Sequence, residues 1–238
     1  MSSNQIMDRL SSGTVYSRDE LYSALSLEKN KLSDSTFRWI LYHLLLEEKI
    51  FRIDYDAYVI DKPQMLPEYK PDYSDKAKTL MEELAVKYPH TPFVIFESTL
   101  MNEFLNHQIA QNTIYVQITK DISSYVFDNL QEEYPGRVLY RPNKGIFNTY
   151  WTKDCIVVLD LISQAPLSKD NPHDMTAEKM LVDIIAEKSI AATYSPAELP
   201  QIFENVRRNY RIDRHKISRY AGRRGKSSLV DAYVGGEI

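Results

Sequence analysis

The sequence contains one cysteine among its 238 residues, so no disulfide can form within the chain. That residue, Cys155, lies in the apolar run CIVVLDLI, where we expect a buried thiol. The first residues, MSSNQIMDRLSSG, lack the apolar core of a signal peptide, and no apolar run approaches the length that crosses a bilayer. We therefore expect a cytoplasmic protein without a membrane partner.

Motifs for catalysis and for cofactor binding are scarce as well. The five histidines show no spacing typical of metal ligands. The segment GRRGKSS is two residues short of the phosphate-binding Walker pattern, and we interpret its first glycine, Gly222, as a helix C-cap. We predict no cofactor, no metal and no catalytic residue. One alternative stays open: Glu97 and Asp160 lie within apolar runs and would bind a metal together if they were adjacent, although an acid paired with an arginine is the commoner arrangement.

Prolines divide the chain. Three of them recur at four-residue spacing among polar residues in DKPQMLPEYKPDY, namely Pro63, Pro67 and Pro71. Because proline removes a backbone donor and disfavours helix before it, we predict a semi-extended linker over 63–73. This linker separates an N-terminal domain over 1–62 from a larger domain over 74–238.

The N-terminal domain has the element order of a winged helix-turn-helix. Its patterns predict helices over 4–12, 16–25 and 35–49, then a strand–turn–strand hairpin over 49–61. A capping-box pattern, Ser17 followed three residues later by Glu20, marks the start of the second helix. In this fold the third helix enters the major groove of DNA and the hairpin forms the wing.

The predicted DNA contacts are the outward side chains near the start of the third helix, together with two basic residues beside it. The helix contributes Ser35, Thr36, Arg38, Trp39 and Tyr42; the preceding turn contributes Lys31, and the wing contributes Arg52. Serine and threonine reach phosphates or base edges, arginine pairs with guanine, and the two flanking residues are expected to hold phosphates. The alternative is a structural or protein-docking role, because this domain carries eight basic and ten acidic residues and is therefore not basic.

The larger domain alternates between strand and helix patterns. Apolar runs over 93–98, 113–119, 137–141 and 155–162 predict strands, and amphipathic segments around them predict helices. The sequence therefore predicts an α/β or α+β domain with helices packed on a small sheet.

A basic ridge, defined here as residues 206–226, contrasts with the acidic remainder of the chain. It carries nine Lys or Arg and one acid, a net charge of +8, whereas the whole chain is −4, so the remainder sums to −12. Apolar positions predict two inward-packed helices, with six outward arginines: Arg207, Arg208, Arg211, Arg219, Arg223 and Arg224. Such a surface faces a polyanion, either the phosphates of DNA or tRNA or an acidic protein patch, and we favour nucleic acid.

Three stretches together suggest a family. They are TFRWILYHLLLEEKIFRIDYDAYVI, then FVIFESTLMNEFLN with NTIYVQIT, then TAEKMLVDIIAEK followed by ISRYAGRRG. In this order they resemble the AbiEi-type antitoxins of type IV toxin–antitoxin systems. In that family the winged helix represses the operon promoter, and the C-terminal domain neutralises a nucleotidyltransferase toxin without a stable complex. The resemblance therefore implies operator DNA and such a toxin as partners.

The third stretch contains Glu178 and Asp183, which the resemblance assigns to an EKxLVD motif. The two residues are five positions apart, which places them about 140° apart around a helix. They therefore do not converge on one ligand. We predict instead that Asp183 pairs with Lys179 one turn earlier, or with a basic neighbour in space.

These observations predict a DNA-binding antitoxin and transcriptional autorepressor that is not an enzyme. Two alternatives stay open, a metal-dependent nuclease that uses the two strand acids and a winged-helix adaptor that binds other proteins.

Overall fold

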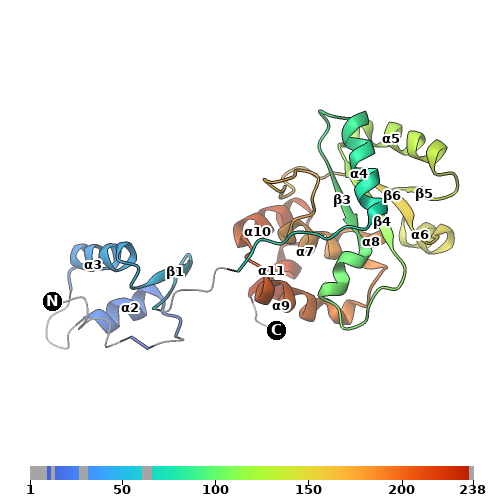
Figure 1. Ribbon diagram of the computed structural model, residues 1–238. Helices are drawn as coiled ribbons and strands as arrows, with labels where there is room; N and C mark the ends of the chain where they lie inside the picture. The colour runs from blue at the N-terminus through green and yellow to red at the C-terminus, as the bar shows by residue number, and fades with distance from the viewer. Residues whose placement is uncertain (1–9, 12–13, 27–31, 61–65, 236–238) are drawn as a thin grey trace. The chain divides into compact units, whose positions relative to one another are not determined.

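The computed structural model of the chain (Figure 1) describes residues 10–11, 14–26, 32–60 and 66–235. The chain divides into two units, Met1–Met65 and Leu66–Ile238, and each has a hydrophobic core of its own. No helix within the described ranges is both long and apolar enough to cross a bilayer.

The first unit contains two helices and a hairpin. Their order along the chain is α2 (Arg18–Leu25), α3 (Asp34–Leu46), β1 (Phe51–Asp54) and β2 (Ala57–Val59). The two strands pair antiparallel, and Tyr16 forms an isolated antiparallel bridge with Tyr58 of β2. This order matches the second and third helices and the hairpin of the predicted winged helix-turn-helix. The helix predicted over 4–12 lies largely outside the described residues.

Local signals fix the starts of both helices. The predicted capping box is confirmed, because Ser17 and Glu20 exchange side-chain and backbone hydrogen bonds at the start of α2. Ser33 starts α3, and its hydroxyl accepts the backbone N–H of Thr36 at 3.1 Å. The inward faces of the two helices and the hairpin form the core, which consists of Leu10, Leu21, Leu25, Phe37, Leu41, Leu44, Ile50 and Tyr58.

The second unit is built on a four-stranded mixed sheet. Its strands are β3 (Phe93–Glu97), β4 (Thr113–Ile118), β5 (Val138–Tyr140) and β6 (Cys155–Asp160), in the spatial order β3-β4-β6-β5. β4 and β5 run parallel to β6, whereas β3 runs antiparallel to β4. β3 and β4 are buried along their whole length, as expected for strands covered on both faces. The predicted mixed α and β architecture is confirmed.

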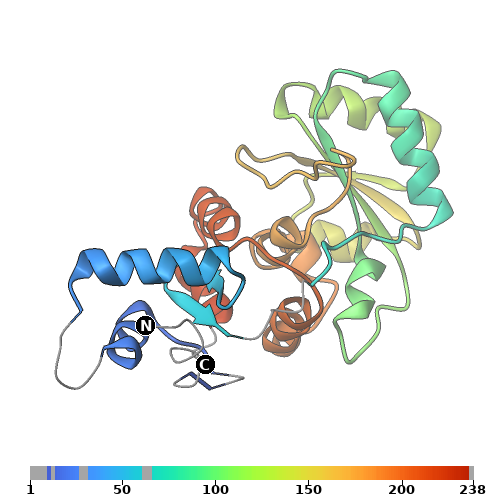
Figure 2. The same cartoon turned by 60° about the vertical axis from the view of Figure 1, so that its left-hand side comes forward.

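Helices cover both faces of this sheet (Figures 1 and 2). One face carries α4 (Asp75–Lys87) and α5 (Lys120–Glu133), and the other carries α6 (Lys144–Tyr150), α7 (Ala177–Ala186) and α8 (Lys188–Ala191). Alternate side chains of each strand therefore enter two different layers of the core.

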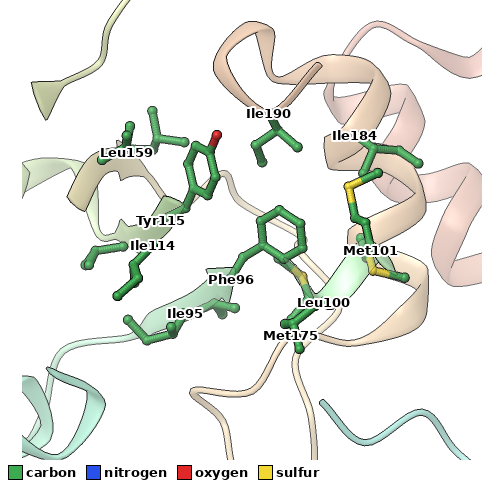
Figure 3. Packing of buried hydrophobic residues seen from close by; sticks show 14 of the residues in the cluster. Ile95, Phe96, Leu100, Met101, Ile114, Tyr115, Leu159, Met175, Ile184 and Ile190 are labelled. Atoms are coloured by element: carbon green, nitrogen blue, oxygen red, sulfur yellow. The ribbon is translucent and has the colours of Figure 1, made fainter. Parts of the chain in front are cut away.

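The side chain of Tyr115 points to the face of the sheet that α8 covers. Its hydroxyl donates to the backbone carbonyl of Ser189 in α8 at 3.1 Å. In Figure 3, Phe96 and Tyr115 point toward Ile190, while Ile95 lies on the opposite side of its strand. The layer between the sheet and α7–α8 thus contains large aromatic side chains.

Three further helices complete the second unit, α9 (Leu199–Asn209), α10 (Arg214–Arg223) and α11 (Ser227–Gly235). α10 and α11 pack against α7, and α9 packs against α11. The predicted inward positions on α9 and α10 are confirmed as buried: Leu199, Ile202, Phe203 and Val206, then Ile217, Tyr220 and Ala221.

Residues 66–73, which the sequence assigns to the linker, pack against the second unit. Tyr73 is buried among its core residues. Its hydroxyl donates to the backbone carbonyl of Ile95 at 2.8 Å and accepts the backbone N–H of Met175 at 2.9 Å. The second unit therefore begins at Leu66, several residues before the predicted boundary.

Two short 3₁₀ helices start without a side-chain cap. The segment after β3 forms a 3₁₀ helix, η1 (Ser98–Glu103), and the Ser98 hydroxyl accepts the backbone N–H of Thr113 instead of capping a helix. Glu198 ends a second 3₁₀ helix, η2 (Pro196–Glu198). Its carboxylate accepts the backbone N–H of Asn106 rather than closing a capping box. In both places a tertiary partner replaces the local one.

Candidate nucleic-acid interface

One face of α3 is open to solvent. Trp39, Tyr42 and Leu46 recur along it at helical spacing, and they are 62%, 60% and 66% exposed. The ring of Trp39 lies against that of His43, with centroids 3.9 Å apart. The outward orientation predicted for Trp39 and Tyr42 is confirmed.

Hydroxyl groups gather at the N-terminal end of this face. The Ser33 hydroxyl lies 2.8 Å from the hydroxyls of both Ser35 and Thr36, and all three residues are exposed. A helix N-terminus carries unpaired N–H groups and a partial positive charge, which favour a phosphate. The predicted positions of Ser35 and Thr36 therefore suit contact with a DNA backbone.

Arg38 reaches solvent from the same helix, as predicted. Its guanidinium lies 2.5 Å from the carboxylate of Asp34 one turn earlier, and the Arg38 side chain is 69% exposed. Asp34 also lies 3.5 Å from the guanidinium of Arg18. An exposed pair of this kind is worth about 0–1 kcal/mol, so Arg38 can exchange its partner at little cost.

Arg52 lies on the wing, where aromatic rings restrain it. Its guanidinium lies 5.6 Å from the ring centroid of Tyr55 and 6.0 Å from that of Tyr58, and it donates to the backbone carbonyl of Tyr55. The residue is exposed on the hairpin. Lys31, the other predicted phosphate contact, lies outside the described residues.

The basic ridge divides into outward and inward arginines. Four of the six predicted contacts are exposed, namely Arg208, Arg211, Arg219 and Arg223. Arg211 forms an ion pair with Glu68 in the segment that precedes α4. The ridge therefore presents less free positive charge than its composition indicates.

The prediction that Arg207 and Arg224 face outward is wrong. The Arg224 side chain is 11% exposed, and its guanidinium lies 3.2 Å from the carboxylate of Glu187 and 3.9 Å from that of Asp183. Arg207 is half-buried and donates to the backbone carbonyl of Val234 at 3.2 Å. Both arginines turn inward because acids of α7 and the end of α11 lie beside them, and neither neighbour is visible in the spacing of α9 or α10.

A buried polar cluster joins α7, β4 and α10. The predicted pair of Lys179 with Asp183 is confirmed, and both side chains are buried. Asp183 also accepts the side-chain amide of Gln117 at 2.9 Å and the hydroxyl of Tyr220 at 2.8 Å. Lys179 donates to the side-chain carbonyl of Gln117 as well. With each charge paired and hydrogen-bonded, the cluster fastens three elements together.

Ionisation within this cluster is strongly perturbed. Burial lowers the pKa of Lys179. Burial opposes ionisation of Asp183, but Lys179 and Arg224 beside it hold the pKa of that carboxyl below its ordinary value. Burial and the charge of Asp183 raise the pKa of Tyr220 well above its ordinary value. Because Lys179 and Asp183 are closed to solvent, these shifts report a structural network rather than a catalytic site.

Glu97 and Asp160 lie near opposite ends of the sheet. Glu97 pairs in register with Ile114 near the start of β4, and Asp160 pairs with Ile118 at its end. Four residues of strand, at about 3.3 Å each, separate the two positions by about 13 Å. The shared metal site that the sequence left open is therefore not formed. Asp160 pairs with Arg141 instead, which is the commoner arrangement.

Neutral donors satisfy Glu97, which is buried and has no cationic partner within the described part of the chain. Its carboxylate accepts the backbone N–H of Ser74 at 2.7 Å, the hydroxyl of Ser74 at 2.6 Å and the side-chain amide of Asn112. Among the described residues, no three His, Cys, Asp or Glu side chains converge as a metal site. The predicted buried thiol of Cys155 is confirmed, and burial raises its pKa.

Two exposed residues of the first unit were not predicted from the sequence to belong to the candidate interface. Leu46 extends the row of Trp39 and Tyr42, and its spacing from Tyr42 was a usable signal. Tyr55, at the turn of the wing, is 79% exposed, and no sequence pattern distinguishes it from a buried hairpin residue.

Comparison with known proteins gives one family-level finding. A model described as "Family of unknown function (DUF6577)" matches residues 36–236, from α3 through the wing to α11. No curated protein matches the chain.

Proposed function

We propose that this chain, which belongs to the family of unknown function DUF6577, is a DNA-binding antitoxin that represses its own operon. The proposal follows the resemblance to AbiEi-type antitoxins. The observation that carries it is the exposed face of α3, where hydroxyl, guanidinium and aromatic groups lie next to a wing that also carries an arginine. In winged helices this helix enters the major groove.

Arg38 is the residue to which we assign base reading. Its exposed pair with Asp34 is worth about 0–1 kcal/mol, whereas a bidentate contact with guanine contributes about 1–3 kcal/mol of discrimination. Exchange of the carboxylate for a guanine edge is therefore favourable. Ser35, Thr36 and Arg52 are assigned to phosphates, which position the helix without reading sequence.

Additional phosphate contacts are assigned to the ridge, because the first unit is not basic by itself. Arg208 and Arg219 are exposed and make no ion pair within the described residues. Contacts of this kind strengthen binding to any DNA sequence and make it sensitive to salt.

The second unit is proposed to counter a nucleotidyltransferase toxin without forming a stable complex with it, as the resemblance implies. Its most strongly interacting ionisable groups, Lys179 and Asp183, are closed to solvent and hold helices to the sheet. The proposed role therefore requires recognition by this unit and no reaction within it.

A second candidate function is a winged-helix adaptor for other proteins. The observation in its favour is the apolar row of Trp39, Tyr42 and Leu46, because aromatic and aliphatic side chains dominate the centres of protein interfaces. In an adaptor, this row would bind a partner protein and α3 would not enter DNA.

The test is a titration of the full chain with DNA from directly upstream of its own gene, at fixed salt. Shuffled DNA of the same length and base composition is the control. A specific repressor should prefer the upstream DNA by about a thousandfold or more. Equal affinity for both DNAs would contradict the repressor function. In parallel, co-expression should restore growth of cells that carry the neighbouring toxin gene. Loss of rescue in Trp39→Ser, together with equal affinity of the unmodified chain for both DNAs, would favour the adaptor.

A further inference from the structure

A cleft of about 290 Å³ opens in the second unit between α4 and the sheet. The first two turns of α4, the starts of β4 and β6, and the turn between α5 and β5 line it. It lies on the face of the sheet opposite the buried cluster of α7 and α10. None of the described residues assigned above to DNA lines it.

The arrangement of the helices explains the cleft. α4 packs against β3, whereas α5 packs over β5 and β6. The two helices run in different directions across this face, as Figures 1 and 2 show. α5 ends at Glu133, and the chain turns at Gly136, whose φ of 72° is a left-handed conformation that glycine adopts without strain. The cleft opens between the first two turns of α4 and the turn after α5, at the starts of β4 and β6.

The floor of the cleft is apolar. Leu80 of α4, Ile114 of β4 and Ile156 of β6 form it, and the strand register places the two isoleucines side by side. The ring of Tyr134 closes one wall, and its hydroxyl donates to the carboxylate of Glu83 at 3.1 Å, which fixes the ring. Such a floor suits an apolar molecular body, because ligand sites are mostly apolar with a few polar groups at the edge.

Among the described residues, the rim carries one cation without a partner. Lys76 lies 2.5 Å from the carboxylate of Asp154, so these two charges offset each other. Asp75 lies in the first turn of α4, where the positive end of the helix dipole offsets its charge. Arg137 is exposed and makes no ion pair or side-chain hydrogen bond within the described part of the chain. The net field at the mouth of the cleft is therefore positive on the side of Arg137.

We propose that this cleft binds a small amphipathic anion, with its apolar body on Leu80, Ile114 and Ile156 and its carboxylate, or a group of the same charge, on Arg137. The volume lies at the lower end of the range for ligand pockets, about 300–1,000 Å³, which suits a short aliphatic or aromatic carboxylate rather than a dinucleotide. The guanidinium fork pairs with a carboxylate through two hydrogen bonds, which explains the preference for an anionic head.

Octanoate is the probe, and 1-octanol is the matched neutral compound. Isothermal titration of the full chain should show saturable one-to-one binding of octanoate. Arg137→Gln should weaken octanoate binding about tenfold and leave 1-octanol unchanged, because only the charged head contacts position 137. Thr79→Trp, at an exposed position on the cleft wall, should abolish binding of both compounds by filling the space. Lys188→Gln, which removes an exposed positive charge elsewhere in the same unit, should change neither.

Three outcomes would overturn the proposal: no saturable octanoate binding to the unmodified chain, binding by Thr79→Trp equal to that of the unmodified chain, or octanoate affinities of Arg137→Gln and Lys188→Gln that do not differ. Thermal unfolding of each variant is followed in parallel, and Arg137→Gln provides an independent test if Thr79→Trp does not fold. The ligand proposal and the DNA-binding proposal depend on different residues, so an experiment that contradicts one does not contradict the other.

Discussion

Lys179 and Asp183 form an ion pair one helical turn apart on α7, and their side chains are 0% and 2% exposed. The pair spans the interface between the sheet and the C-terminal helices, because Gln117 of β4 and Tyr220 of α10 hydrogen-bond to it. Two buried charges attract each other strongly, but both lose their hydration, so the intact pair adds little net stability. Removal of one partner leaves the other charge buried and uncompensated, which is strongly destabilising. The second unit is therefore sensitive to single substitutions at either position.

Lys179→Met should destabilise the chain by about 3–5 kcal/mol, because it leaves the carboxylate of Asp183 buried with only part of its compensation. Urea denaturation followed by circular dichroism measures this change. Lys87→Met is the matched control, since Lys87 pairs with Glu133 at 2.6 Å on an exposed surface. The control should change the free energy of unfolding by about 0–1 kcal/mol. Equal effects of the two substitutions would show that burial of the pair is immaterial.

Acid should unfold the chain partly through Asp183. Burial opposes ionisation of this carboxyl, but Lys179 and Arg224 hold its pKa in the folded chain below the unfolded value. The unfolded state therefore binds the proton more tightly. The resulting stabilisation is complete above pH of about 4, the range of an unfolded aspartate, and is lost as pH falls through the lower folded pKa. Asp183→Asn should flatten this dependence between pH 2 and 5. If the free energies of unfolding of the unmodified chain and of Asp183→Asn differed by the same amount at every pH, the acid sensitivity would not come from Asp183.

Tyr73 should be essential to the second unit although it precedes the first helix of that unit. Tyr73→Ala removes a buried ring and should cost about 3–5 kcal/mol. Tyr73→Phe keeps the ring but loses hydrogen bonds to Ile95 and Met175, and should cost about 1–3 kcal/mol. An unchanged denaturation midpoint in Tyr73→Ala would show that residues 66–73 are a linker and do not stabilise the second unit.

Salt dependence tests the ridge. Charge reversal of Arg208 and Arg219 together should lower the slope of log affinity against log salt by about 1.8, if each contacts one phosphate of duplex DNA. The preferred DNA sequence should not change, because phosphate contacts carry no sequence information. Lys120→Glu, an exposed site on α5, is the control. An unchanged slope with lost rescue from the toxin would assign the ridge to the antitoxin activity instead. The variant with Arg224 reversed is unsuitable here, since that side chain is largely buried beside Asp183.

The sequence predicts well what depends on neighbours along the chain. The pairing of Lys179 with Asp183 follows from their separation by one helical turn, and the capping box of Ser17 follows from Glu20 three residues later. The outward face of α3 follows from the apolar positions opposite it. These features require only the geometry of one helix.

What the sequence does not predict depends on contacts between distant segments. Arg224 turns inward because α10 packs on α7 beside Asp183 and Glu187, 41 and 37 positions earlier. Glu97 and Asp160 are both acids at strand ends, but only the sheet order and direction show that those ends lie apart. The cleft beneath α4 likewise depends on how two helices share one face of the sheet.

Base reading by α3 is measured with Arg38→Ala in a titration with upstream DNA at fixed salt. Arg38→Ala should lose affinity roughly ten- to hundredfold, because a base contact contributes about 1–3 kcal/mol, and it should discriminate less against shuffled DNA. Lys49→Ala, which removes one positive charge from the same unit beyond the far end of α3, should reduce affinity for both DNAs equally and only slightly. Unchanged affinity in Arg38→Ala, or the same uniform loss in both variants, would contradict base reading by this helix.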